Sequence, residues 1–489
     1  MHFAFGLPLR SLFPDDIPIY MLRLLFISLS FICLTSLHAQ VYQGLQVPFN
    51  LGRFGTTSPI TQASGLALDP NGTSFWTHND QGNPTTKLYK FLPATGNQAV
   101  TIQKEVNILN VTNLDWEDLA EDTFGNIYVC QIGKNCNDNS DPNECPNRFV
   151  FKIHKVPLAT LNHPDSVNVT PQTYYFKYPL TGYETNNCQS GDTVFVNSES
   201  ALWYEGAIYV FTKNIWSKPT NNCGGWVTGY CYYFKINLTA GSTMENPIVA
   251  IYKGKVNLIT NPNDIPAKYQ ATAAAISPDH STLALTTYGR LWLFRHFTSD
   301  SFFNGTAMYV DYSGTGLDTI THGYEGLEFK NDHYLDLCVD GVNGRVSGIL
   351  VDSVALWIKQ DGNAGPGSLR NAALCANAGD TLKFKSILYN DTIHLTTSPI
   401  IFNDDVRIVQ SSGQPIFIQA LTTSVFNISP GRNITFDNIS ILSSASLQSA
   451  VINQGTLWLK DVNIKQFNTQ HPGLNNTGVL HLSGMCHFQ

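Results

Sequence analysis

The stretch LDWEDLAEDTFGNIYVCQIG, residues 114–133, decides the fold, because its pattern returns four more times along the chain. Each copy begins with a small or acidic residue, continues as a short apolar strand, and passes a turn of Gly, Asn or Asp into further strands. The other copies are ASGLALDPNGTSFWTHND (63–80), SESALWYEGAIYVFTKN (198–214), TAAAISPDHSTLALTTYGRLWLF (272–294) and YEGLEFKNDHYLDLCVD (324–340). Units of several strands, repeated without helices, predict a β-propeller.

The blade number stays open at five or six. Residues 41–60 could donate a strand that closes the ring, or could help to build an additional blade. Both possibilities place the propeller within residues 41–355, and both predict an all-β protein.

The composition agrees with this fold class and argues against a nucleic-acid partner. Charged residues make up 13% of the 489 residues and aromatic residues 12%, and there are 37 Gly and 24 Pro. This mixture favours a turn-rich β protein over a helical bundle. The net charge of −8 comes without a basic run, so we expect no nucleic-acid partner.

The N-terminus predicts export. Residues 21–39, MLRLLFISLSFICLTSLHA, combine one Arg, a short apolar run and a small residue at the expected cleavage point after Ala39. Residues 1–20 read as an upstream extension. The apolar run is short for a membrane span, so we expect a secreted or cell-surface protein with no membrane span after cleavage; an uncleaved anchor is the alternative.

Export makes disulfides permissible. Cys136 and Cys145 flank a polar insert and are predicted to pair. A second insert offers one more bridge among three cysteines, with Cys188 and Cys223 the preferred pair and Cys231 the third. The cysteine spacing does not favour zinc. Cysteines in apolar patterns are expected to be small buried hydrophobes: Cys130, Cys338 and Cys375.

The pattern changes after Val351. Residues 356–380 are expected to form a linker and a helical cap, with a short helix starting at Ser368. Residues 381–489 give short β-branched strands with Asn, Asp and Gly turns at a spacing of about 22 to 25 residues, which predicts a parallel β-helix. The last residues, HLSGMCHFQ, fall within a strand pattern, so we expect this domain to be incomplete.

Two resemblances accompany these patterns. THNDQG, NLDWEDLAED, SESALWYEGAIYVFTKN and AAAISPDHSTLALTTYGRLWLF together resemble secreted propellers of Bacteroidetes, which are distantly similar to phytase-like and esterase-like propellers. SLRNAALCANAGDTLKF resembles the N-terminal entry of secreted right-handed parallel β-helix domains. The first resemblance implies a fold more than a chemistry.

Three acids occupy the same place in three repeats: Glu117, Glu199 and Glu325. Ser64 and Ala273 hold that place in the other two. Because inner propeller strands converge on a central channel, the three acids could form a ring that binds Ca²⁺ or a polar ligand. They could also accept backbone hydrogen bonds from the next blade and pin the strand edge, or serve in acid/base chemistry.

Other polar residues are weaker candidates. His78 and Asp80, in THND, could place an imidazole and a carboxylate at the channel mouth. Arg290, close to Tyr288, could clamp an anion through its planar fork of donors. Structural turn roles are the alternative for both. The remaining acids of the opening stretch are expected to lie on a solvated turn or rim: Asp115, Asp118, Glu121 and Asp122.

These features predict a secreted or cell-surface binding or adhesion protein, whose partner would be a polysaccharide or another cell-surface ligand. The alternative is a Ca²⁺-assisted hydrolase of phosphate or ester bonds. Standard nucleophile and phosphate-loop motifs are missing from the sequence, which disfavours the usual hydrolase and nucleotide-dependent enzymes. Lyase chemistry on the β-helix is disfavoured too, because only one charged cluster occurs there, at Asp404, Asp405 and Arg407.

Overall fold

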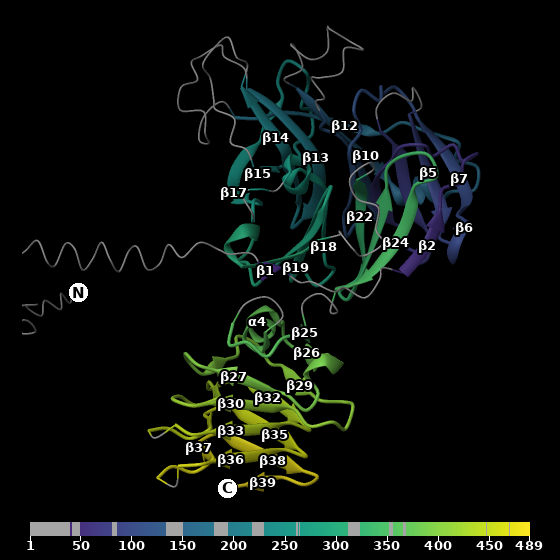
Figure 1. Ribbon diagram of the computed structural model, residues 1–489. Coiled ribbons are helices and arrows are strands. Elements are labelled where there is room, and N and C mark those ends of the chain that lie inside the picture. Colours follow the sequence, from purple (N-terminus) through teal and green to yellow (C-terminus); the bar gives the residue numbers. More distant parts are fainter. Residues whose placement is uncertain are drawn as a thin grey trace, which may run out of the picture. The chain divides into compact units, whose positions relative to one another are not determined.

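The structure is a computed structural model in which two all-β parts follow one another along the chain (Figure 1). It describes residues 40–41, 49–80, 86–133, 150–179, 194–217, 229–260, 263, 265–311, 323–351, 356–364, 368–445, 447–468 and 470–489.

The first three blades are antiparallel sheets, and two of them gain a short parallel strand at the outer edge. The first blade contains β3 (Ala63–Leu68), β4 (Phe75–Asn79), β5 (Lys87–Leu92), β7 (Thr101–Ile108) and β11 (Asn168–Val169). The second contains β8 (Asp118–Glu121), β9 (Asn126–Gln131), β10 (Phe151–Pro157), β12 (Gln172–Lys177) and β16 (Ile248–Val249). The third contains β13 (Val194–Tyr204), β14 (Ala207–Ser217), β15 (Tyr230–Ile236) and β17 (Ile251–Asn257).

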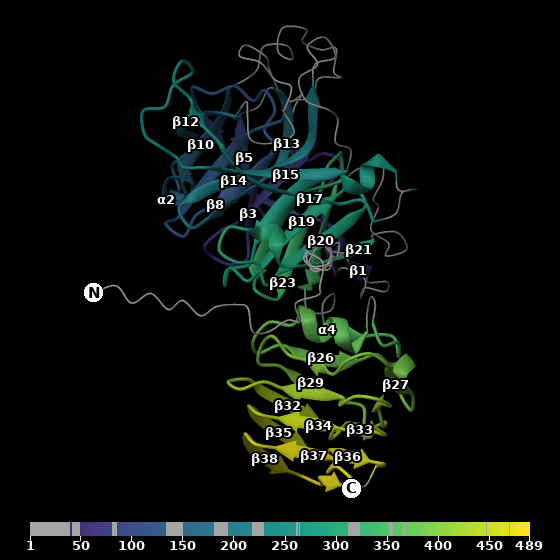
Figure 2. The same ribbon diagram turned by 90° about the vertical axis from the view of Figure 1, so that its left-hand side faces the viewer.

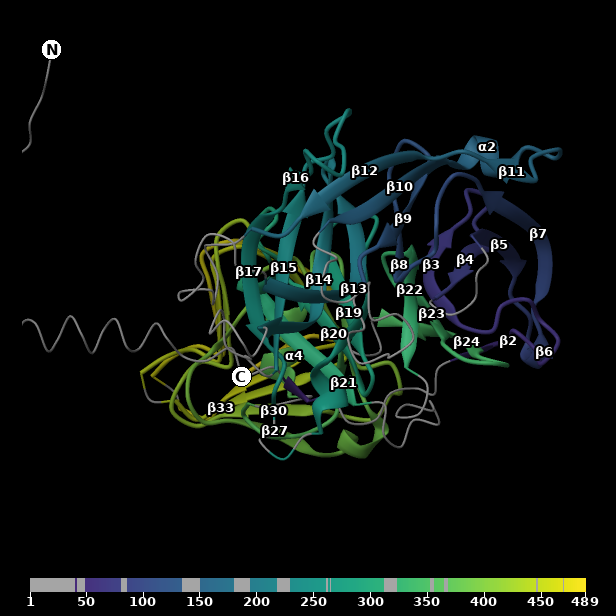
Figure 3. The same ribbon diagram turned by 90° about the horizontal axis from the view of Figure 1, so that it is seen from above.

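Two further blades complete the ring. The fourth contains β18 (Ala271–Ile276), β19 (Thr282–Thr287), β20 (Arg290–Arg295), β21 (Thr306–Asp311) and β1 (Gln40–Val41). The fifth contains β22 (Tyr324–Asn331), β23 (Tyr334–Val339), β24 (Arg345–Leu350), β2 (Phe49–Arg53) and β6 (Gly96–Ala99). The first strands of the blades lie next to one another around the centre, as Figure 3 shows for β3, β8, β13 and β22.

The protein therefore contains a five-bladed β-propeller, which decides between the two predicted blade numbers. Strand β2 pairs antiparallel with β24 and parallel with β6. The start of the propeller segment thus supplies an outer strand to the last blade, so residues 49–53 close the ring and do not build a sixth blade.

The blade strands are apolar because neighbouring blades cover both of their faces. Every residue of β9 is buried, and Trp76, Trp116 and Trp292 are fully buried. The turns explain the acids that flank these strands. Oδ1 of Asp122 accepts backbone hydrogen bonds from Phe124 and Asn126, both at 2.9 Å, and so shapes the hairpin between β8 and β9.

The second part is a parallel β-solenoid of three sheets. One sheet contains β25 (Trp357–Ile358), β26 (Thr381–Phe384), β29 (Arg407–Val409), β32 (Asn433–Asp437), β35 (Thr456–Lys460) and β38 (Val479–Ser483). The second contains β27 (Thr392–Leu395), β30 (Phe417–Ala420), β33 (Ser440–Ser443), β36 (Asn463–Gln466) and β39 (His487–Phe488). The third contains β28 (Ile400–Ile401), β31 (Phe426–Ile428), β34 (Val451–Asn453) and β37 (Leu474–Asn476).

The solenoid coils stack on one another, as Figure 2 shows, and their strands pair in matching registers. Ile418, Ile441 and Ile464 occupy equivalent buried positions in three successive coils. Helix α4 (Leu369–Cys375) begins after Ser368, whose Oγ accepts the backbone N–H of Asn371 at 3.3 Å. The predicted short helix with its cap at Ser368 is confirmed. Strand β25 lies within the residues for which a linker and cap were expected.

Several predictions lie outside the described residues. These are the export segment 21–39 and the disulfide candidates Cys136, Cys145, Cys188 and Cys223. The prediction that Cys130, Cys338 and Cys375 are buried thiols is confirmed, and Cys231 is also buried and free. Within the described ranges no helix is both long and apolar enough to cross a membrane.

Candidate functional site

One end of the propeller channel is built from two positions in each blade. The first is at a bulge in or just before the innermost strand and is held by Ser64, Glu117, Glu199, Thr272 and Glu325. Thr272 takes the place that the sequence predicted for Ala273, because the register shift of its strand falls at Thr272, as the shifts of the other strands fall at Glu199 and Glu325. The second is near the channel end of the next strand and is held by Asp80, Lys213, Tyr288 and Asp340. In the second blade Ile132 holds this place, and Gly133 follows it. We call the nine residues other than Ile132 at these two positions, together with Asp115 and Gly133, the polar ring.

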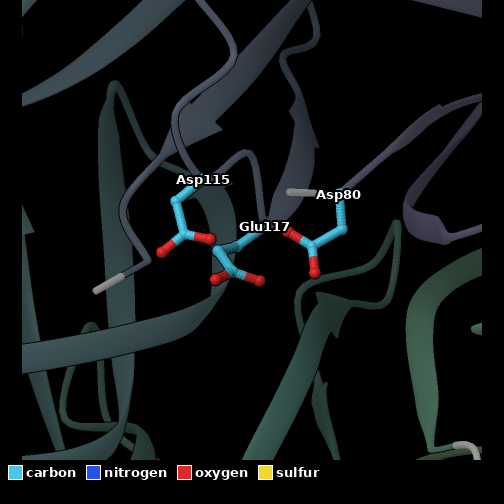
Figure 4. A group of neighbouring side chains, drawn as sticks. All are labelled: Asp80, Asp115 and Glu117. Carbon is cyan, nitrogen blue, oxygen red and sulfur yellow. The ribbon is translucent and has the colours of Figure 1, made fainter. Parts of the chain in front are cut away.

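Asp80, Asp115 and Glu117 form the carboxylate triad of the ring. One carboxylate oxygen from each lies within 4.8 Å of the others, and Figure 4 shows Glu117 between Asp115 and Asp80. Asp115 is 2% and Glu117 3% exposed. Oε1 of Glu117 is buried without a hydrogen-bond partner among the described residues. A buried carboxylate oxygen in this state is costly, which points to a ligand that the triad would bind.

Gly133 makes the space in which the triad converges. It follows Ile132, which holds the place that Lys213, Tyr288 and Asp340 take in other blades. A Cβ atom on Gly133 would overlap Oε1 of Glu117 and would lie 2.5 Å from Oδ2 of Asp115. The second blade therefore needs glycine here, because any side chain would displace the two carboxylates.

Lys213 organises the other side of the ring. Its Nζ donates to Oε1 of Glu199 at 2.5 Å and to the hydroxyl of Tyr288 at 2.6 Å, and it lies 4.7 Å from the centre of the Tyr288 ring. The Tyr288 hydroxyl donates to Oε1 of Glu325 at 3.3 Å. We call Lys213, Glu199, Tyr288 and Glu325 the Lys213 cluster.

The charges of the two groups act on each other. Burial raises the pKa of Glu117 well above its usual range, and the charges of Asp80, Asp115 and Glu199 raise it further, while Lys213 lowers it. Burial lowers the pKa of Lys213, but Glu199, Tyr288, Glu325 and Glu117 outweigh this and hold it well above its usual value. The triad would therefore favour a cation, and Lys213 remains an ammonium group.

The residues predicted from sequence separate into two sets. Glu117, Glu199, Glu325 and Asp80 all lie in the polar ring, but in two different groups of it. His78 is fully buried behind the ring, where its Nδ1 lies 3.1 Å from the carbonyl oxygen of Asn79. Burial lowers the pKa of His78 to about 4.

Arg290 lies on β20, the third strand of its blade, and is 2% exposed. Its guanidinium carbon lies 4.5 Å from the centre of the Tyr309 ring, and Nη1 donates to the carbonyl oxygen of Leu258 at 3.5 Å. These contacts belong to the packing between strands. Tyr288, its predicted partner, belongs to the Lys213 cluster instead.

The prediction that Asp115, Asp118 and Asp122 are solvated is wrong, since their exposed fractions are 2%, 0% and 4%. Asp118 accepts backbone hydrogen bonds from Leu119 at 2.9 Å, Ala201 at 2.8 Å and Ala274 at 3.4 Å. These donors lie on β8, β13 and β18. Asp118 therefore pins three blades at the centre, a role that had been considered for the neighbouring Glu117.

Sequence reasoning missed Lys213, Asp340 and Gly133. A signal for them exists, because THND, QIG, FTKN, TTYG and CVD lie in or directly after the second strand of each repeat. Only Asp occurs there in two blades, as Asp80 and Asp340. No residue recurs in three blades, as Glu does at the first position, so the pattern did not mark these positions as a set.

Comparisons with known proteins add no function. No family model and no curated protein matches the chain. Solved structures that resemble it include the β-propeller domain of Cps50 (Swd1) from "Myceliophteria thermophila", with 10% identity, a TM-score of 0.30, and coverage of 62% of this chain and 100% of that one.

The WD40 repeats of RRP9 are 9% identical, with a TM-score of 0.30 and coverage of 63% and 100%. A protein of unknown function from Bacteroides thetaiotaomicron is 10% identical, with a TM-score of 0.31 and coverage of 62% and 74%. Likeness at this level carries no argument about ligand or activity.

Proposed function

We propose that the propeller is a cation-dependent binding module, in which the carboxylate triad holds Ca²⁺ and the ion presents a polysaccharide or another polyhydroxyl cell-surface ligand. The buried, unpartnered Oε1 of Glu117 between two further carboxylates carries this proposal. Oxygen ligands of this kind suit Ca²⁺, which takes six to eight of them. Three carboxylates leave coordination positions for water or for ligand hydroxyls.

The Lys213 cluster favours binding over catalysis. A general base or nucleophilic amine must be able to take up or share a proton near the reacting atoms. Lys213 is held as an ammonium group by the acids around it, and its Nζ is already bonded to Glu199 and Tyr288. His78 has no exposed surface from which to reach a ligand.

The alternative is a Ca²⁺-assisted hydrolase of phosphate or ester bonds, in which the same ion would polarise the scissile group. The proposed setting for either activity is a secreted or cell-surface protein of the Bacteroidetes type. Export would use residues 21–39, and the solenoid would coil right-handed, as the resemblance of SLRNAALCANAGDTLKF implies.

The test is thermal unfolding of the full exported chain with added calcium and with a chelator. An ion that binds only the folded state raises the melting temperature in a saturable way. Glu117→Gln should fold and lose this response. Glu105→Gln is the control, because Glu105 pairs with Lys87 at the surface, away from the polar ring. If calcium shifts neither wild type nor the Glu105→Gln variant, the proposal is wrong.

Ligand assays then separate binding from hydrolysis. A glycan array probed with and without chelator should show calcium-dependent binding that Glu117→Gln abolishes. A library of phosphate and ester substrates should show no turnover. Calcium-dependent turnover that Glu117→Gln abolishes would overturn the binding proposal in favour of the hydrolase.

A further inference from the structure

The Lys213 cluster resembles a cation-binding site in which the bound cation is the ammonium group of Lys213 itself. The ammonium group of Lys213 contacts a carboxylate and a phenol oxygen, with Nζ 2.5 Å from Oε1 of Glu199 and 2.6 Å from the Tyr288 hydroxyl, and that hydroxyl donates to a second carboxylate, Glu325. The side chain of Lys213 is 12% exposed and that of Glu199 is 4%. Buried carboxylates require a counter-charge, and the ammonium supplies it.

The triad and the Lys213 cluster are neighbouring parts of one ring. Glu117 of the triad and Glu199, which binds Lys213, hold the same place on β8 and β13, and these two innermost strands are in contact with each other. A positive charge that stabilises Glu117 as a carboxylate also repels a second cation bound to it. The coupling between two bound cations must be reciprocal.

We infer that the polar ring has two cation positions: an exchangeable one at the carboxylate triad, and a second one between Glu199, Tyr288 and Glu325 that the ammonium of Lys213 occupies permanently. This inference rests on the proposed function, because it requires the triad to bind calcium. Lys213 therefore limits the ring to one calcium ion and weakens the affinity for that ion.

Replacing Lys213 by an uncharged side chain of similar length should open the second position. In Lys213→Met, we expect two equivalents of calcium to bind where wild type binds one. While the second position is empty, the ion at the triad should bind at least about tenfold more tightly than in wild type, because the positive charge of Lys213 is gone. Lys213→Arg retains the charge and should bind one equivalent.

Lys90 offers a matched control. Its Nζ lies 2.8 Å from Oδ2 of Asp69, and the exposed fractions of the two side chains, 14% and 3%, are close to those of Lys213 and Glu199. Lys90 lies on β5 and takes no part in the polar ring. Lys90→Met should lose a buried ion pair yet bind one equivalent of calcium with unchanged affinity.

The experiment is calorimetric titration of the full chain with calcium, after circular dichroism has established that each variant is folded. Two equivalents for Lys213→Met and one for Lys90→Met support the inference. One equivalent for Lys213→Met, with wild type also binding one, overturns it and leaves the proposed function standing. A wild type that binds no calcium refutes the proposed function itself.

If Lys213→Met does not fold, the double variant Glu199→Gln with Lys213→Met replaces the ion pair by uncharged side chains. It keeps the triad but lacks one carboxylate of the second position. We then expect one equivalent of calcium, bound more tightly than in wild type. An affinity equal to or weaker than that of wild type would overturn the inference.

Discussion

Oδ2 of Asp118 accepts a hydrogen bond from the backbone N–H of Ala201 at 2.8 Å, across the boundary between two blades. The same oxygen faces the N–H of Ala274 in a third blade at 3.4 Å. Innermost strands leave backbone donors unpaired on the side that faces the channel, and one carboxylate here satisfies several of them.

Asp118→Ala should destabilise the propeller strongly. The substitution leaves buried backbone N–H groups without acceptors, each costing about 1–3 kcal/mol, so we expect a loss of about 3 kcal/mol or more in the free energy of unfolding. Asp332→Ala is the control: Asp332 accepts the backbone N–H of Asp279 at the same 2.8 Å, but at the surface. Urea unfolding of both variants measures the difference, and equal losses would contradict the buried role of Asp118.

Gly133→Ala should abolish calcium binding. The added methyl group would overlap Oε1 of Glu117, so the triad could no longer converge. Gly72→Asn tests glycine replacement elsewhere, because Gly72 has open space around it and a positive φ that Asn tolerates. Calcium titration of the two variants checks this. Retained binding in a folded Gly133→Ala protein would show that the triad does not hold the ion.

The stability of the propeller should decrease as pH rises from about 4 to about 7, in part because of Asp336. This residue is 1% exposed, neither of its carboxylate oxygens has a hydrogen-bond partner among the described residues, and burial raises its pKa to about 7. Between its usual value of 3.8 and about 7, the folded state holds a proton that the unfolded state releases. Folding therefore becomes less favourable as pH rises through this window.

Asp336→Asn removes that dependence, since the amide stays neutral. Between pH 5 and pH 8, the free energy of unfolding of wild type should fall by on the order of a few kcal/mol more than that of the variant. Urea unfolding of both proteins at the two pH values gives the comparison. A difference between variant and wild type that does not change with pH would show that burial does not raise the pKa of Asp336.

Shortening a side chain in the solenoid core should lower the stability of the solenoid and leave the calcium site unchanged. Ile441 is fully buried in the stack between Ile418 and Ile464. Ile441→Ala should cost about 2–5 kcal/mol of local stability. Hydrogen exchange should be faster across β30, β33 and β36, and calcium affinity should equal that of wild type. Faster exchange in the propeller blades instead would contradict this.

Repetition made much of the fold predictable. Five copies of one pattern of strands and turns predicted the propeller. After residue 351 the strands recur at a shorter spacing, which predicted the parallel coils. The blade number could not be predicted, because it depends on pairing between β2 and β24, which lie at opposite ends of the propeller segment. Sequence patterns report local periodicity well and long-range pairing poorly.

Only part of the candidate site could be predicted from the sequence. Glu117, Glu199 and Glu325 recur at one repeat position, so their shared location could be inferred. Their division into two groups depends on Asp115 and Lys213, and neither follows from a repeated residue. The burial of Asp118 escaped prediction for a related reason: its partners are backbone N–H groups of other blades, which have no signature in the side-chain pattern.

The pairing of β2 has a consequence for how the chain is made. β2 is among the earliest propeller strands to be synthesised, and its antiparallel partner β24 is the last strand of the fifth blade. Until that partner emerges, one edge of β2 is open, while β6 can already hold the other edge. Ring closure is therefore a late event of biosynthesis, and a ribosome that stalls before residue 345 would release a sheet edge prone to pairing with other chains.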